Sequence, residues 1–142
     1  MRADQRAVIR SVLSESRRIA VVGASQDPGR PSHGVIRRLL DMGYAIVPVN
    51  PNASRIHGLD VHPSLEDVGG PVDIVDVFRR SEHAPEVATA AVAAGAKALW
   101  LQQGVRSDEA RAIAEDAGLL YVEDACLAVE AERAGIPLPP PA

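Results

Sequence analysis

Five short and almost uninterrupted runs of aliphatic residues constrain the fold of this 142-residue chain more than any other feature. They show no alternation of apolar and polar residues, which indicates strands that are buried on both faces. Strands of this kind are typical of a parallel sheet that is covered by helices. The runs span residues 19–23, 45–49, 73–78, 97–101 and 119–122.

Segments with helical spacing lie before, between and after these runs. Four of them have a glycine at or shortly after their end, as is common where a helix ends in left-handed backbone. The alternation of strands and helices predicts an α/β fold, doubly wound, with a mainly parallel five-stranded sheet and helices on both faces. The predicted helices cover residues 5–16, 35–40, 85–94, 107–118 and 124–133.

The length of the chain is that of one domain, and no internal boundary or repeat interrupts it. Residues 50–68 are the least regular part, where we expect a short strand at 57–61 and a helical turn at 64–67. The last six residues hold four prolines, which predicts a mobile tail. The expected division is therefore one domain over residues 1–135, followed by a proline-rich tail over residues 136–142.

Charge and composition exclude several classes of function. Fifteen Lys and Arg against 19 Asp and Glu give a net charge of −4, which disfavours broad electrostatic binding to nucleic acid or to anionic membrane. The single cysteine, Cys126, allows neither an internal disulfide nor a Cys-rich zinc site. No apolar run approaches the ~18 residues of a membrane span, and the first 18 residues do not resemble a signal peptide. We therefore expect a cytoplasmic protein that binds neither nucleic acid nor membrane.

Ligands of open α/β sheets bind at the carboxyl ends of the strands, near the point where the strand order reverses. The first such loop, residues 23–32, is rich in small residues, glycine and proline, and it leads directly into a helix. Backbone N–H groups at the start of a helix favour a phosphate. We expect phosphate binding here, and a tight capped connection is the alternative interpretation.

The loop is not the standard dinucleotide fingerprint. Gly23 and Gly29 have the spacing Gly-x5-Gly, not that of Gly-x-Gly-x-x-Gly. The second strand ends at Asn50, where an NAD enzyme has an acidic residue for the ribose diol. The Gly-Lys-Ser/Thr motif of a P-loop is also absent. These features predict a nucleotide ligand of another kind.

An ordered set of motifs resembles the stand-alone CoA-binding domain proteins. The resemblance covers roughly residues 10–135 and implies a Rossmann-like fold, related to the CoA-binding domain of succinyl-CoA synthetase α subunits and ADP-forming acyl-CoA synthetases. Those larger enzymes carry a phosphorylated histidine on a second domain, for which this chain has no room, so the resemblance implies CoA binding and not ligase chemistry. The motifs are Gly23-Ala-Ser-x-x-Pro-x-Arg-Pro-Ser32, Gly43-Tyr-x-Ile-Val-Pro-Val-Asn-Pro51, Ser64-Leu-x-Asp67, Val72-Asp-Ile-Val-Asp-Val-Phe-Arg-Arg-Ser-Glu82, Gly95-Ala-Lys-Ala-Leu-Trp-Leu-Gln-x-Gly104 and Asp124-x-Cys126.

The same resemblance implies three groups of residues around CoA. The phosphates face the first group, the ribose 3′-phosphate and adenosine lie near the second, and the third lines the opposite side. The groups are Gly23, Ala24, Ser25, Pro28, Arg30, Pro31 and Ser32; then Asn50, Pro51 and Asn52; and then Val77, Phe78, Arg79, Gln102, Gln103 and Gly104.

Two positions depart from the family pattern. Relatives often have a lysine for the 3′-phosphate directly after Asn-Pro, where this chain has Asn52. We therefore expect Arg30 and Arg55 to supply the missing charge. Near the C-terminal end, the usual Asp-Arg-Cys has Ala125 in place of the arginine, so the role of that arginine is lost or relocated.

Other candidate residues have structural interpretations that we favour. The four histidines lack a metal-ligand spacing, and Cys126 is more simply a buried thiol than a nucleophile, because no local motif supplies a base. The favoured function is a non-catalytic module for CoA or an acyl-CoA that acts as a carrier, a sensor or a partner of an acyl-CoA-metabolising enzyme. The alternatives are a small NAD(P)-dependent or other nucleotide-dependent enzyme, and a redox-responsive regulator that acts through Cys126.

Overall fold

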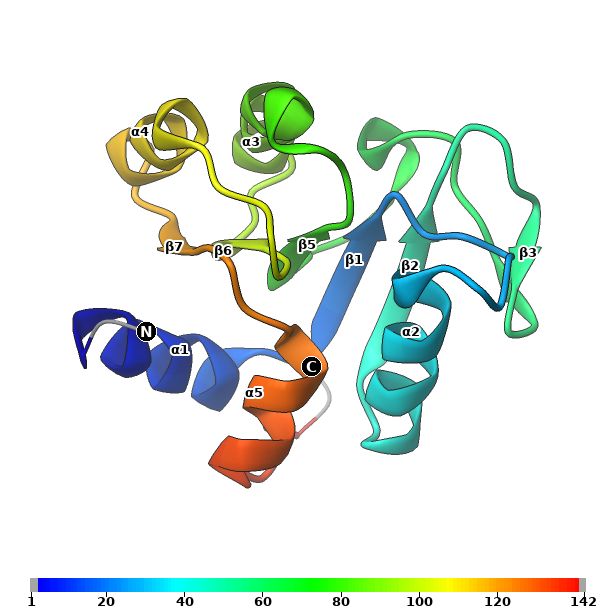
Figure 1. Ribbon diagram of the computed structural model, residues 1–142, viewed down its shortest axis with the longest axis horizontal. Coiled ribbons are helices and arrows are strands. Elements are labelled where there is room, and N and C mark those ends of the chain that lie inside the picture. Colours follow the sequence, from blue (N-terminus) through cyan, green and yellow to red (C-terminus); the bar gives the residue numbers. More distant parts are fainter. Residues whose placement is uncertain (1–2, 141–142) are drawn as a thin grey trace.

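A single parallel sheet organises the molecule, as the computed structural model of residues 3–140 shows (Figure 1). Its strand order, β2-β1-β5-β6-β7, places the first strand between the second and the third of the sheet, so the order reverses beside β1. Every pair of neighbouring strands is parallel. The predicted doubly wound, Rossmann-like sheet is therefore confirmed. The strands are β1 (Arg18–Val22), β2 (Ala45–Val49), β5 (Ile74–Val77), β6 (Ala98–Leu101) and β7 (Leu120–Val122).

Helices cover both faces of the sheet (Figure 1). One face carries α1 (Ala3–Glu15), α2 (Pro31–Asp41) and α5 (Leu127–Ala134), and the other carries α3 (Ala84–Ala93) and α4 (Asp108–Asp116). Each face has its own hydrophobic core, because successive side chains of a strand point to opposite faces. This is why the strand sequences are apolar without alternation.

Asp73 stands before β5 and not inside it, at the amino ends of the strands. Its Oδ2 accepts hydrogen bonds from the backbone N–H groups of Arg17 and Arg18, both at 2.9 Å. Burial alone would raise the pKa of this carboxyl, but these bonds and Lys97 outweigh burial and lower the pKa. Asp73 therefore joins the starts of neighbouring strands, at the edge of the sheet opposite the expected site.

Two predicted elements differ from those observed. The segment expected as one strand at 57–61 folds as a hairpin of β3 (Arg55–Ile56) and β4 (Leu59–Asp60), because His57 and Gly58 have positive φ and form a two-residue turn. The last helix begins at Leu127 and not at residue 124, since Asp124 has a φ of 52°. The helical turn expected at 64–67 is present as a 3-10 turn, Leu65–Asp67.

The proline-rich end of the chain is less free than its composition suggests. Ile136 and Leu138 pack against the core that lies under α2 and α5. The Arg17 guanidinium donates a hydrogen bond to the carbonyl of Pro139 at 3.1 Å. The part of the predicted tail up to Pro139 therefore contacts the domain, and residues 141–142 lie outside the described part. No described helix combines the length and the hydropathy needed to cross a membrane.

Candidate functional site

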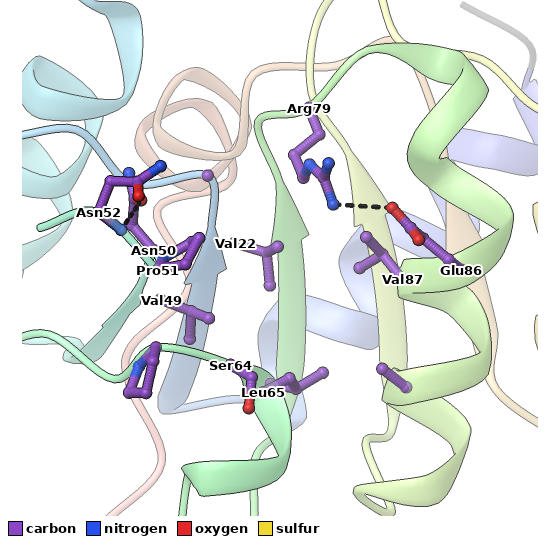
Figure 2. A pocket seen from close by; sticks show the side chains of 13 residues that line it. Val22, Val49, Asn50, Pro51, Asn52, Ser64, Leu65, Arg79, Glu86 and Val87 are labelled. Carbon is purple, nitrogen blue, oxygen red and sulfur yellow. Dashed lines mark hydrogen bonds and ion pairs between the residues drawn. The ribbon is translucent and has the colours of Figure 1, made fainter.

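Two cavities lie side by side at the carboxyl edge of the sheet. They share Gly23, Asn50 and Arg79, so they meet where β1 ends. The β2 cavity has a volume of about 460 Å³ and the β6 cavity about 650 Å³. Besides the shared residues, the β2 cavity is lined by Val22, Val49, Pro51, Asn52, Pro63, Ser64, Leu65, Glu86, Val87 and Ala90 (Figure 2). The β6 cavity is lined by Ser25, Arg30, Pro31, Ser32, Val35, Phe78, Arg80, Gln102, Gln103, Val105 and Cys126.

Gly23 forms the boundary between the two cavities. It has a φ of 87°, and a Cβ at this position would lie 2.7 Å from the carbonyl oxygen of Phe78. A side chain here would therefore collide with the end of β5, and the positive φ adds strain for any other residue. The N–H groups of Gly23 and Ala24 both donate to the carbonyl of Val49, at 3.0 and 3.3 Å. The turn consequently holds the ends of β1, β2 and β5 together.

Two polar side chains of the site are engaged in holding its loops. Asn50 Nδ2 donates to the carbonyl of Ala24 at 2.6 Å, while Asn50 Oδ1 accepts from the N–H of Asn52 at 2.8 Å. Ser32, which is buried, accepts from the N–H of Ser25 at 3.0 Å through its Oγ. Asn50 and Ser32 thus fix the backbone around the two cavities.

The amino end of α2 faces the β6 cavity. Arg30 is the N-cap residue and Pro31 the first residue of the helix, and no side chain caps the first turn. The partial positive charge of a helix start is therefore available at this wall. Arg30 is exposed, lines the cavity and forms no ion pair with any residue between 3 and 140. Charge and helix dipole together make this corner suitable for a phosphate.

The other arginines near the site differ in whether they line a cavity and whether an acidic residue already pairs with them. Arg79, shared by both cavities, pairs with Glu86 of α3 at 2.9 Å, across the β2 cavity (Figure 2). Arg80 is exposed at the rim and lies 3.9 Å from Glu82. Arg55 lies in the hairpin, where it pairs with Asp60 at 2.7 Å and also bonds the carbonyl of Gly58. Arg55 lines neither cavity.

A buried acid lies behind the wall of the β6 cavity. Asp76 in β5 has no exposed surface, and its Oδ1 accepts a hydrogen bond from Gln102 Nε2 at 2.7 Å. Its Oδ2 has no hydrogen-bond partner among the described residues. Burial raises the pKa of this carboxyl to about 7, although the bond from Gln102 acts in the opposite direction.

The structure brings most of the sequence-predicted residues together, but not all. Ala24 and Val77 are buried, Pro28 is exposed, and the N–H of Gly104 bonds Asp124 at 2.7 Å. These four residues, like Arg55, line neither cavity. The predicted residues that do line them are Gly23, Ser25, Arg30, Pro31, Ser32, Asn50, Pro51, Asn52, Phe78, Arg79, Gln102 and Gln103.

Among the lining residues that sequence reasoning missed, two groups stand out. One is the segment before β5, where Pro63, Ser64 and Leu65 line the β2 cavity. The motif that begins at Ser64 was already part of the family resemblance and could have pointed to it. The other is α3, which contributes Glu86 and Val87 from its first turns (Figure 2). Nothing in the local pattern of α3 distinguishes these positions from an ordinary helix face.

A third cavity, between α1, α4 and β7, has a volume of about 570 Å³, and the arginines in its lining are paired with acidic residues. Its Arg106 pairs with Asp124 at 2.5 Å and with Glu123 at 3.8 Å, and Arg111 lies 3.9 Å from Glu123. The N–H of Gly104 and then Arg106 lower the pKa of Asp124. Across residues 3–140, no group of three or more His, Cys, Asp or Glu side chains could hold a metal ion. The carboxyl edge of the sheet is therefore the best candidate site.

A glycine turn at the switch point of a parallel sheet, followed by a helix that begins at a cavity, defines a Rossmann-like nucleotide-binding domain. The family model for the CoA binding domain matches residues 17–132. The chain belongs to this CoA-binding domain family.

Relatives include both small proteins and parts of large enzymes. An uncharacterized protein of Bacillus subtilis, YneT, is 41% identical over 91% of this chain and 96% of its own length. The acetate–CoA ligase (ADP-forming) II of Archaeoglobus fulgidus is 32% identical over 68% of this chain, which corresponds to 15% of the ligase. The structure of a hypothetical protein from Pyrococcus horikoshii OT3 superimposes with a TM-score of 0.88 at 34% identity, covering 94% of this chain and 96% of that one.

The buried carboxyl of Asp76 makes stability depend on pH in a definite direction. Its folded pKa, about 7, lies above the ~3.9 of an unfolded aspartate, so folding favours the protonated form. Its contribution to stability is complete below about pH 4 and is lost as the pH rises towards 7. We expect Asp76→Asn, which is neutral at every pH, to be more stable than the wild type at pH 8 by up to about 4 kcal/mol.

Urea unfolding of both proteins at pH 4 and pH 8 measures this difference. The gain should be small at pH 4, where the wild-type carboxyl is already protonated. An equal gain at both pH values would show that ionisation of Asp76 is not its cause.

Proposed function

We propose that this protein binds coenzyme A across the two cavities at the carboxyl edge of the sheet, as a binding module without catalytic activity. The observation that carries the proposal is the meeting of two cavities at Gly23, beside the start of α2. A CoA diphosphate at this meeting point would face the helix dipole and Arg30, and its two ends would extend in opposite directions. Membership of the CoA-binding domain family supports the same ligand.

The linings of the cavities suggest which end of CoA each would hold. The β2 cavity has the apolar side chains of Val22, Val49, Leu65 and Val87 around the adenosine position that the family resemblance implies. The β6 cavity extends from the phosphate corner to Phe78 and beyond, and would hold the pantetheine arm. In this orientation the diphosphate lies over Gly23, which has no side chain of its own, and beside Arg79, which lines both cavities.

The hydrogen bonds of the Asn50 side chain argue against a dinucleotide as the ligand. In NAD enzymes an acidic residue at this place binds the ribose diol. Here the residue is neutral, and both its amide nitrogen and its amide oxygen already bond the backbone of the loops. A ribose diol would find neither charge nor a free bidentate acceptor at Asn50.

The surroundings of Cys126 argue for binding without catalysis. This thiol, the N-cap residue of α5, lines the β6 cavity and is the candidate nucleophile there. A nucleophilic cysteine needs a base within reach, and neither cavity is lined by a histidine. His33 and His57 instead stack on each other with ring centroids 4.0 Å apart, and His83 lies 3.4 Å from Glu86.

We expect CoA to bind and NAD not to bind. The Gly23 turn and α2 can receive a diphosphate from either ligand, but only NAD depends on an acid at position 50. Isothermal titration calorimetry of CoA, acetyl-CoA, NAD, NADP and ATP compares them under one condition. Tighter binding of NAD than of CoA would contradict the proposed function.

The position of Arg30 modifies the role expected from the sequence. Because it lies at the start of α2 on the β6 cavity, we expect Arg30→Ala to weaken CoA and dephospho-CoA equally, by about tenfold or more for a lost charge-assisted hydrogen bond. Arg37→Ala, on an exposed position of the same helix, is the matched control. A larger loss for CoA than for dephospho-CoA would assign Arg30 to the 3′-phosphate instead.

The isolated protein should not hydrolyse or transfer the acyl group of acetyl-CoA. Forming a thioester needs an activating nucleotide and its domain, and breaking one needs an activated nucleophile. Incubation with acetyl-CoA, followed by a colorimetric measurement of free thiol, should show only the rate of the buffer. Faster release that disappears in Cys126→Ser would make the protein an enzyme.

A further inference from the structure

A hydrogen-bonded pair of polar side chains separates the sheet core from the β6 cavity. Asp76 lies in β5, between β1 and β6, and has no exposed surface. Gln102 directly follows β6, is only 4% exposed, and donates from Nε2 to Asp76 Oδ1 at 2.7 Å. Gln102 lines the cavity and Asp76 does not. The carboxamide of Gln102 is thus anchored on its inner side and meets the cavity on its other side.

The second polar atom of this carboxamide has no partner. Gln102 Oε1 accepts no hydrogen bond from any residue between 3 and 140. In the same range, the fully buried side-chain atoms without a partner are His62 Nδ1 and Asp76 Oδ2. Gln102 Oε1 is not one of them, so it is accessible from the cavity that Gln102 lines. A nearly buried acceptor without a protein donor can accept a hydrogen bond from a group that enters the cavity.

The chemistry of an amide oxygen selects the kind of ligand group. A phosphate offers oxygen acceptors at neutral pH and is repelled by another acceptor, whereas an N–H group is attracted. The side chains of Val35, Phe78 and Val105 around the same cavity are apolar. The matching group is therefore an uncharged N–H within an otherwise apolar chain. The pantetheine arm of CoA has this chemistry, because it carries two secondary amides between aliphatic segments.

We propose that Gln102 accepts a hydrogen bond from a secondary amide of the pantetheine arm, and that Asp76 is a positioning residue that holds Gln102 in place for it. This inference rests on the proposed function, which it deepens by assigning specificity for the arm of the ligand. A glutamine side chain rotates about three single bonds, and an anchor in a central strand removes that freedom before the ligand arrives.

The first test removes the acceptor. Gln102→Leu should weaken binding of CoA about tenfold, because the amide of the arm loses its hydrogen-bond partner. The same variant should bind 3′-phospho-ADP, which is CoA without pantetheine, within about twofold of the wild type. Gln5→Leu is the matched control, since Gln5 is another partly buried glutamine that bonds the backbone of Glu123 and lines a different cavity. It should leave both affinities within about twofold.

The second test removes the anchor. Asp76→Asn keeps an oxygen that accepts from Gln102 and should retain CoA affinity within about twofold. Asp76→Ala removes that oxygen and should weaken CoA about fivefold, with no effect on 3′-phospho-ADP. In the Gln102→Leu background, Asp76→Ala should cause no further loss, because the two residues act as one unit. Thermal unfolding confirms that each variant is folded before titration.

The outcomes separate this inference from the proposed function. If the wild type binds neither CoA nor 3′-phospho-ADP, the proposed function fails and this inference fails with it. If the wild type binds CoA but Gln102→Leu binds it equally well, or loses both ligands equally, only the amide contact is overturned. If Asp76→Ala binds CoA like the wild type while Gln102→Leu does not, the amide contact stands and the positioning role is overturned.

Discussion

The turn at Gly23 is the constraint on which the rest of the site depends. Gly23 has a positive φ and passes so close to β5 that a Cβ here would lie 2.7 Å from the carbonyl oxygen of Phe78. The carbonyl of Val49 receives both N–H groups of the turn, and the N–H of Phe78 bonds the carbonyl of Val22 at 2.8 Å. The ends of three strands are thus joined through backbone alone. Gly23 itself adds no side chain to the surface above them, and one cavity lies on each side.

Most polar groups around this turn are used by the protein itself. Asn50 and Ser32 fasten the loops, Arg79 pairs with Glu86, and Asp124 holds the N–H of Gly104. Preorganisation of this kind lowers the entropy that a ligand must overcome on binding. The groups that it leaves available for a ligand include the start of α2 with Arg30, and the oxygen of Gln102.

An acidic protein that binds a polyanion must place its available cations locally. The net charge is −4, and several arginines near the carboxyl edge are engaged in ion pairs or lie away from the cavities. Arg30 is the exception within residues 3–140 among the arginines that line the cavities, because it has no acidic partner there. The helix start beside it contributes positive potential without a net charge. Electrostatic attraction is therefore concentrated at the start of α2, on the wall of the β6 cavity.

The sequence alone determined the elements and their order, because periodicity, glycine and proline act over a few residues. Apolar strands, helices and the glycine turn followed from it, and they place most of the predicted residues at one edge of the sheet. Tertiary structure alone decided which polar side chains bond to other parts of the protein and are therefore unavailable to a ligand. Arg55 forms an ion pair with Asp60 within its own hairpin. Gln102 donates a hydrogen bond to Asp76, which lies on a strand 26 residues earlier in the chain. Such pairings depend on three-dimensional distances and burial, which no local pattern encodes.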